Sequence, residues 1–146
     1  MKRSPLSRSM ESLRLSGYIA EKVEYWNSWT HTRHDLFGFA DIIAARDTPY
    51  LEILLVQTTS RGNIRSRIRK IDSLPSSNSW LAAGGTIEVH GWGKVKGGKK
   101  VATWSLLRVR RLPSGGWRVQ SLDPTDHALI GGGDLDGGDL SDGGVV

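Results

Sequence analysis

The run LEILLV at residues 51–56 constrains the fold more than any other feature of the sequence. Its apolar side chains stand at successive positions, whereas a strand with one solvent-exposed face alternates apolar and polar residues. A strand of this kind is buried on both faces, in the middle of a covered sheet. Two strands are predicted before it, over residues 18–26 and 36–45, and the turn residues 46–49 separate the second of them from residues 51–58.

Three helices are predicted to cover this sheet. Residues 5–16 begin with a proline, which suits a first helical turn, and Gly17 can end the helix. Its apolar face is formed by Leu6, Met10, Leu13 and Leu15. Ile64, Ile68 and Ile71 follow the i, i+4, i+7 spacing of an amphipathic helix over residues 63–74, and a short helix at residues 77–85 ends in glycines.

Further strands are predicted at residues 86–92, 100–112 and 117–122, with turn-rich connections at residues 96–100 and 112–116. The predicted order of elements is therefore α-β-β-β-α-α-β-β-β. This order favours the α/β (α+β) class, with one central mixed sheet flanked by helices.

Charge is distributed unevenly along the 146 residues. Residues 1–120 contain 20 basic and nine acidic side chains, a net charge of +11, whereas residues 121–146 contain six aspartates and no basic residue. We therefore expect one basic domain over residues 1–125 and a flexible acidic, glycine-rich tail over residues 126–146. A basic domain favours a nucleic-acid partner, although a solvated charged surface explains the charge about as well.

Several classes of protein are disfavoured by composition. The chain has no cysteine, which excludes disulfide scaffolds, thiolate nucleophiles and cysteine-ligated zinc. No apolar run approaches the roughly 20 residues that span a bilayer, and the first residues have no apolar signal segment, so we expect a soluble, cytoplasmic protein without a membrane partner. The histidines lack HExxH spacing, and no Walker A or G-x-S-x-G pattern is present.

Polar residues inside the apolar strands are the best candidates for chemistry. Asp41 lies within GFADIIA, where a buried carboxylate is costly unless it is paired or bound to a cation. Gln57 and Thr59 end the next strand, and strand alternation predicts that they share a face while Thr58 points away. A hairpin between the two strands would bring Asp41, Gln57 and Thr59 together.

This arrangement resembles the PD-(D/E)XK, or restriction-endonuclease-like, nucleases, in which a carboxylate on one strand precedes a Glu/Gln-x-Lys pair on the next. The series RHDLFGFADIIA, LLVQTTS and AAGGTIEVHGW is, more narrowly, similar to small phage-encoded proteins of this fold that are often labelled Holliday-junction-resolvase-like. The resemblance covers residues 17–94. The helix between the last two segments contributes Asn63, Arg67, Lys70 and Ile71.

The resemblance implies a DNA endonuclease of phage or prophage type that acts in the cytoplasm of the host cell and forms a homodimer. It implies that Mg²⁺ or Mn²⁺ is bound by Asp41, the side-chain oxygen of Gln57 and the backbone carbonyl of Thr58. A second carboxylate is expected from Glu24 or Asp35; the latter could instead be a turn residue or a partner of Arg33. The expected DNA contacts are Arg33, His34, Ser60, Arg61, Asn63 and Arg65.

The chain departs from the family pattern at Thr59, where the motif has a lysine. In this superfamily the catalytic lysine can migrate to the following helix, so Lys70 and Arg67 are the candidates for the missing cation; without the resemblance both would be interpreted as solvated residues. Two alternatives stay open. One is a catalytically silent DNA-binding protein of the same fold, and the other is a phage interaction protein without a nucleic-acid role.

Overall fold

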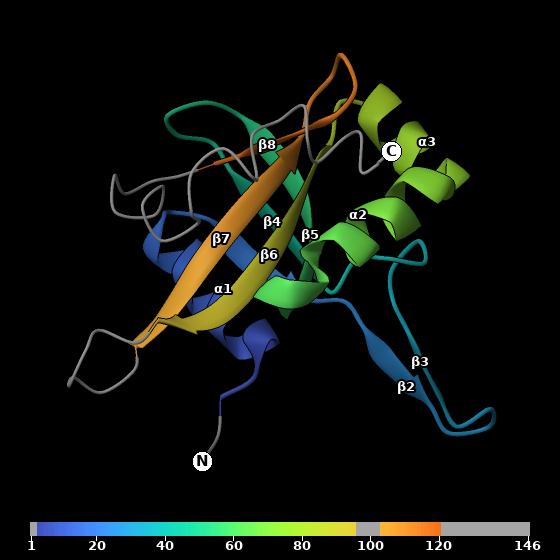
Figure 1. Cartoon of the computed structure of the whole chain (residues 1–146). Helices are drawn as coiled ribbons and strands as arrows, with labels where there is room; N and C mark the ends of the chain where they lie inside the picture. The colour runs from blue at the N-terminus through green and yellow to red at the C-terminus, as the bar shows by residue number, and fades with distance from the viewer. Residues whose placement is uncertain (1–2, 96–102, 121–146) are drawn as a thin grey trace.

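Strand β5 (Glu52–Ser60) lies in the middle of a six-stranded mixed sheet, as its apolar run predicts. We describe residues 3–95 and 103–120 of the computed structural model. Strand β5 pairs antiparallel with β4 (Ile42–Arg46) and parallel with β6 (Thr86–Val95). Strand β1 (Ile19–Lys22) forms one edge of the sheet, and β7 (Thr103–Arg111) followed by β8 (Trp117–Val119) completes the other side. The order of the strands is β1-β4-β5-β6-β7-β8 (Figure 1).

The two faces of this sheet are covered by different helices. Helix α1 (Pro5–Leu15) packs over one face, where Leu13 meets Leu54 and Val56 in one buried cluster. Helices α2 (Ile64–Ser73) and α3 (Pro75–Ala82) cover the other face. Helix α2 contributes Ile64, Ile68 and Ile71 to the core on that face, where they pack with Leu55, Ile87 and Val89 of the sheet. Successive residues of β5 therefore pack into the cores on opposite faces of the sheet. The prediction of an α+β fold with a central mixed sheet is confirmed.

The predicted helices agree closely with the structure. Pro5 occupies the first turn of α1, and the Ser4 hydroxyl accepts a hydrogen bond from the Ser7 N–H at 3.1 Å as the N-cap. Gly17, at φ +93°, ends the helix as expected. The prediction for Leu15 is wrong, because its side chain is 81% exposed.

Gly91 of β6 leaves the space in which the start of helix α2 packs on the sheet. A short 3₁₀ helix, η1 (Arg61–Asn63), leads from β5 into α2. A Cβ atom at Gly91 of β6 would lie 2.3 Å from the Ile64 side chain, so a larger residue here would force Ile64 at the start of α2 to shift. Gly91 is the cross-strand neighbour of Thr59.

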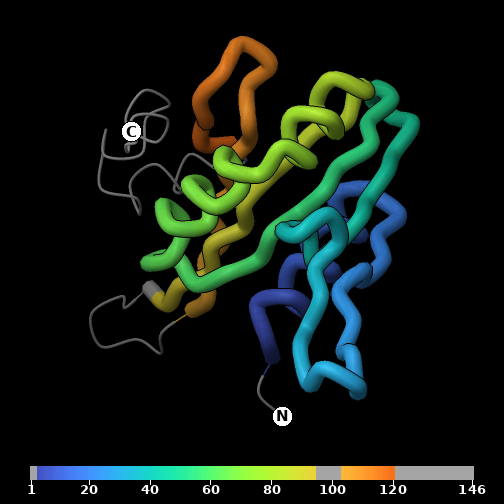
Figure 2. The backbone as a smooth tube through the Cα atoms, turned by 90° about the vertical axis from the view of Figure 1, so that its right-hand side faces the viewer, coloured from blue at the N-terminus to red at the C-terminus, as the bar shows by residue number. Residues whose placement is uncertain are grey.

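Two strand predictions need correction. The strand expected over residues 18–26 is broken: β1 ends at Lys22, and β2 (Tyr25–Asn27) pairs instead with β3 (Thr32–His34) in a separate two-stranded sheet. The strand expected over residues 36–45 begins only at Ile42, because Phe37 and Gly38 adopt positive φ in a tight turn. The predicted order of elements thus lacks the β2–β3 hairpin. This hairpin projects from the body of the protein (Figure 2).

The strands after α3 follow the prediction, and the turn at residues 112–116 is closed by a 2.9 Å hydrogen bond from the Leu112 N–H to the Gly116 carbonyl. The turn predicted at residues 96–100 and the tail predicted at residues 126–146 lie outside the described residues. Among the helices that the structure describes, none is both long and apolar enough to cross a membrane.

Candidate metal centre

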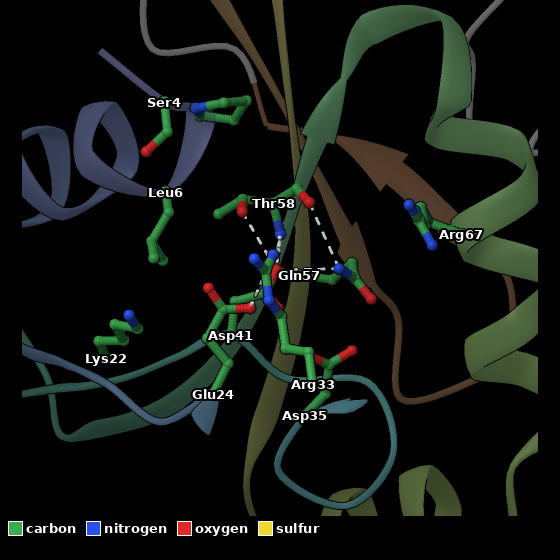
Figure 3. A pocket seen from close by; sticks show the side chains of 11 residues that line it. Ser4, Leu6, Lys22, Glu24, Arg33, Asp35, Asp41, Gln57, Thr58 and Arg67 are labelled. Atoms are coloured by element: carbon green, nitrogen blue, oxygen red, sulfur yellow. Dashed lines mark hydrogen bonds and ion pairs between the residues drawn. The ribbon is translucent and has the colours of Figure 1, made fainter. Parts of the chain in front are cut away.

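Asp41 is buried directly before β4 and is held by the neighbouring strand. Its Oδ2 accepts hydrogen bonds from Gln57 Nε2 at 2.9 Å, from the Thr58 N–H at 2.7 Å and from Thr58 Oγ1 at 3.1 Å (Figure 3). The antiparallel register of β4 and β5, which places Ile42 opposite Val56, brings these groups together. The structure therefore brings Asp41 and Gln57 together as the hairpin predicts, whereas Thr59, expected with them, makes none of these hydrogen bonds.

Both candidates for a second carboxylate lie beside Asp41. One carboxylate oxygen from each of Glu24, Asp35 and Asp41 lies within 4.8 Å of the other two. Glu24 follows β1 and Asp35 follows β3. The β2–β3 hairpin between them therefore brings Asp35 back beside Glu24. This acidic cluster could hold a metal ion.

The electrostatics of the cluster favour a bound cation. The pKa of Asp41 is raised from 3.8 to about 7, first by burial and also by the charges of Asp35 and Glu24, and the Thr58 N–H offsets only part of this effect. A carboxylate in such surroundings resists ionisation until positive charge compensates it. A divalent ion would provide that charge.

Gln57 supplies an independent sign of a missing ligand. Its Nε2 donates to Asp41 Oδ2 and, at 3.3 Å, to the Thr58 carbonyl, while its Oε1 is buried without a hydrogen-bond partner among the described residues. A buried acceptor left unpaired is costly. Rotation of the amide about its last side-chain bond would present Oε1 toward the same two oxygens, where a cation would replace both N–H bonds. The donors predicted from Asp41, Gln57 and the Thr58 carbonyl therefore fit an oxygen-ligated ion such as Mg²⁺ or Mn²⁺.

Cationic side chains surround this cluster in a pocket of about 540 Å³. Arg67 reaches it from α2, and its Nε is buried with no hydrogen-bond partner in the part of the chain that the structure describes. Arg33 lies 3.9 Å from Glu24 and also lines the pocket. Lys70 does not line the pocket but lies 3.5 Å from Asp35.

Lys22 of β1 also lines the pocket, and sequence reasoning missed it. A signal was present, because alternation along an extended chain places residues 22 and 24 on one side. The argument that selected Glu24 applies equally to Lys22.

Thr58 and Thr59 differ from their predicted roles in the strand. Thr58, expected to point away, reaches Asp41 through its hydroxyl. Alternation still places Thr58 and Gln57 on opposite faces of β5, but Asp41 lies just beyond the paired residues of β4 and its Oδ2 accepts from both side chains. Thr59 is buried beside Gly91 and does not line the pocket.

The predicted DNA contacts are spread along the pocket side and the start of α2. Arg33 lines the pocket, and His34 stacks on Tyr25 within the hairpin. The remaining candidates lie at the end of β5 or after it and do not line the pocket: Ser60, Arg61, Asn63 and Arg65. Arg61 donates a 2.8 Å hydrogen bond to Ser105 of β7, so it also helps to fix η1 against the sheet.

A buried charge network on the α1 face was also missed. Glu88 accepts hydrogen bonds from Arg108 and Arg110, and His90 joins Glu88 to Ser9 of α1 at 2.9 Å on each side. The register of β6 and β7 pairs Glu88 with Arg110 and His90 with Arg108. The alternation of charged and apolar residues in these strands could have indicated one polar face, but not that α1 covers it.

Comparisons of the chain with protein-family models, with curated proteins and with solved structures give no match. The arrangement of the site's own residues is therefore the basis for assigning a function.

Proposed function

We propose that this protein is a metal-dependent DNA endonuclease of phage or prophage type, with a restriction-endonuclease-like fold similar to that of Holliday-junction-resolvase-like proteins. The observation that carries the proposal is the buried Oε1 of Gln57, which has no hydrogen-bond partner in the described part of the chain and lies beside the cluster of Glu24, Asp35 and Asp41. A hydrolytic metal site needs such a set of oxygen donors next to a space for a phosphodiester.

The ion would be held by Asp41, the Gln57 side-chain oxygen, the Thr58 carbonyl and one of the two other acids. When bound, Mg²⁺ or Mn²⁺ lowers the pKa of a coordinated water and neutralises charge on the scissile phosphate. The Thr58 N–H and hydroxyl keep one oxygen of Asp41 in place, so the carboxylate is already oriented.

Arg67 is our candidate for the cation that Thr59 does not supply. It extends into the pocket from the α2 face of the sheet, which is also the face of Gln57, and its buried Nε has no hydrogen-bond partner within residues 3–95 and 103–120. Positive charge aimed at the developing oxyanion is a major part of phosphoryl-transfer catalysis. Lys22 can add charge from β1, whereas Lys70 is engaged by Asp35.

Binding of DNA is supported by charge. Lys22, Arg33 and Arg67 border the pocket, and residues 1–120 carry a net charge of +11. Such a surface attracts the phosphate backbone. We also propose homodimers, since two nicks in a junction need two active sites and each chain offers one.

A catalytically silent DNA-binding protein is the second candidate function. The observation that favours it is Thr59, which leaves the motif without its lysine. If wild-type protein binds Mn²⁺ and binds DNA in a salt-sensitive manner but cleaves no DNA with Mg²⁺ or Mn²⁺, this second function is correct. A protein with no salt-sensitive DNA binding at all would fit the third alternative, an interaction protein.

Calorimetry with Mn²⁺ tests the metal centre directly. Wild-type protein should bind the ion, Asp41→Ala should abolish binding, and Glu21→Gln, which removes an exposed acid of β1 from outside the pocket, should bind as wild type does. Equal binding by Asp41→Ala would refute the site. A cleavage panel of branched and linear DNA with Mg²⁺, Mn²⁺ or EDTA then tests the endonuclease itself.

A further inference from the structure

The β2–β3 hairpin exposes aromatic rings that the fold does not use. Its two strands form a sheet of their own, and such a hairpin is at best marginally stable in water. Tyr25 and Trp26 are each 60% exposed, and Trp29 at the tip is 93% exposed. Exposed aromatic residues gathered on one projecting element mark an interaction site.

Hydrogen bonds within the hairpin hold its tip in a defined shape. Asn27 Oδ1 accepts from the N–H groups of Trp29 and Thr30, at 2.9 and 3.3 Å. The Thr30 and Thr32 hydroxyls lie 2.6 Å apart. Trp29 is therefore presented by an ordered turn, which lowers the entropic cost of a contact made through its ring.

The hairpin is continuous with the candidate metal centre. Glu24 directly precedes β2 and Asp35 directly follows β3. Arg33 of β3 points into the pocket toward the acids (Figure 3) and is the cross-strand partner of Trp26. Because cross-strand partners share a face, the ring of Trp26 lies on the side of the hairpin that leads to the pocket.

The chemistry of the hairpin suits nucleobases. The segment YWNSWTHTRH at residues 25–34 combines three aromatic residues with one arginine and two histidines, and it contains no acid. Aromatic rings beside cationic and N–H donor groups bind single-stranded nucleic acids by stacking on bases. Paired bases in a duplex are not available for such stacking.

We propose that the β2–β3 hairpin binds unpaired bases of a DNA strand, with Trp29 and Trp26 as the stacking residues, and that the substrate carries a flap or another single-stranded segment next to the cleaved bond. This inference rests on the proposed function, because it assumes DNA in the pocket. It adds the class of DNA, which the metal centre alone leaves open.

The test measures the affinity of the full chain for three DNAs of equal length, with Ca²⁺ in place of Mg²⁺: a fork, a single strand and a duplex. For Trp29→Ala we expect affinity for the fork and the single strand to fall about tenfold, as for loss of one stacked base, with duplex affinity unchanged. Trp29→Phe should keep most of the affinity. Trp104→Ala, which removes a partly exposed tryptophan on β7, is the matched control and should bind as wild type does.

A fork with 2-aminopurine at its first unpaired position gives a second readout. Its fluorescence should be quenched by wild-type protein, and the quenching should be lost in Trp29→Ala. Equal loss for duplex and fork, or no loss for either, would overturn the stacking proposal while leaving the endonuclease intact. Absence of DNA binding by wild type would overturn the proposed function itself. If Trp29→Ala instead abolishes a concentration-dependent dimer and leaves DNA affinity unchanged, the hairpin is a protein interface and the proposal is wrong.

Discussion

At the scale of single residues, we expect the carboxylate of Asp41 to have opposite effects on metal binding and on the stability of the metal-free protein. In the proposed metal centre its buried carboxylate would bind the cation, yet without one it lies close to the carboxylates of Glu24 and Asp35. Replacing it with asparagine removes the repulsion while keeping an oxygen that can accept from Thr58. We expect Asp41→Asn in EDTA at neutral pH to raise the free energy of unfolding by about 1–2 kcal/mol, measured by urea denaturation.

Glu21→Gln serves as the control for this measurement, because Glu21 is exposed and should change stability by less than about 0.5 kcal/mol. A lower stability for Asp41→Asn would contradict the prediction. It would mean that the charged hydrogen bonds to Thr58 outweigh the repulsion among the acids.

Arg67 is the residue on which catalysis should depend most after the metal ligands. Loss of an oxyanion-stabilising group commonly costs about 3 kcal/mol, or about a hundredfold in rate. Arg67→Ala should therefore reduce single-turnover cleavage about a hundredfold and leave affinity, measured with Ca²⁺, nearly unchanged. Lys70→Ala is the comparison, since Lys70 contacts Asp35 and lies outside the pocket lining, and its effect on the rate should be much smaller.

Equal losses of rate and affinity in Arg67→Ala would identify Arg67 as a phosphate contact and contradict the catalytic role. Such a residue would also reduce the salt slope of binding by about one.

At the scale of elements, a buried charge network joins α1 to the sheet through the contact of His90 with Ser9. Burial lowers the pKa of His90, and Arg108 and Arg110 lower it further against the opposing effect of Glu88. The neutral ring donates from Nε2 to Glu88 and accepts at Nδ1 from the Ser9 hydroxyl of α1. The pKa of Glu88 is also low: burial would raise it, but His90, Arg108 and Arg110 outweigh that effect.

The sign of the pH dependence follows from these shifts. The folded protein resists protonation of His90, whereas the unfolded chain takes up a proton below its ordinary pKa of about 6.5. The contribution of His90 to the free energy of unfolding should therefore fall as pH drops from 7 to 5, by up to about 1.4 kcal/mol per pH unit, whereas the raised pKa of Asp41 contributes in the opposite direction over this range. Glu88 should add a further loss below about pH 4.5.

Denaturant unfolding between pH 5 and 8 checks this prediction. Relative to wild type, His90→Gln should gain stability as pH drops from 7 to 5, whereas His31→Gln, at an exposed position of the hairpin, should keep the slope of wild type. Identical slopes for all three proteins would show that His90 does not govern the acid response.

Elements with local signals could be predicted from the sequence, and elements set by distant contacts could not. The apolar run of β5 and the spacing of the isoleucines of α2 indicate burial from the local sequence alone, so both elements were predicted. Antiparallel pairing of β5 with the preceding strand then predicted that Gln57 lies beside Asp41. The β2–β3 hairpin was missed because its side chains are exposed and carry no apolar pattern. The approach of Arg67 to the pocket depends on how α2 packs over Gly91, which spacing within the helix does not reveal.

At the scale of the whole molecule, the uneven charge should govern DNA affinity. Residues 1–120 carry a net charge of +11, and four of the aspartates lie within residues 131–146. We expect affinity to fall steeply as salt rises, because binding releases counterions from DNA. Deletion of residues 131–146 should tighten binding at low salt, since it removes charge that competes with DNA for the basic surface.

The comparison that isolates this effect is a full-length chain in which those four aspartates, Asp134, Asp136, Asp139 and Asp142, are replaced by asparagine. It should bind as tightly as the truncated chain, because the competition arises from charge and not from the length of the segment. Both variants should converge on wild-type affinity at high salt, where screening is nearly complete. Unchanged or weaker binding after truncation would show that the acidic segment does not compete with DNA, and the salt dependence would then arise from the basic residues alone.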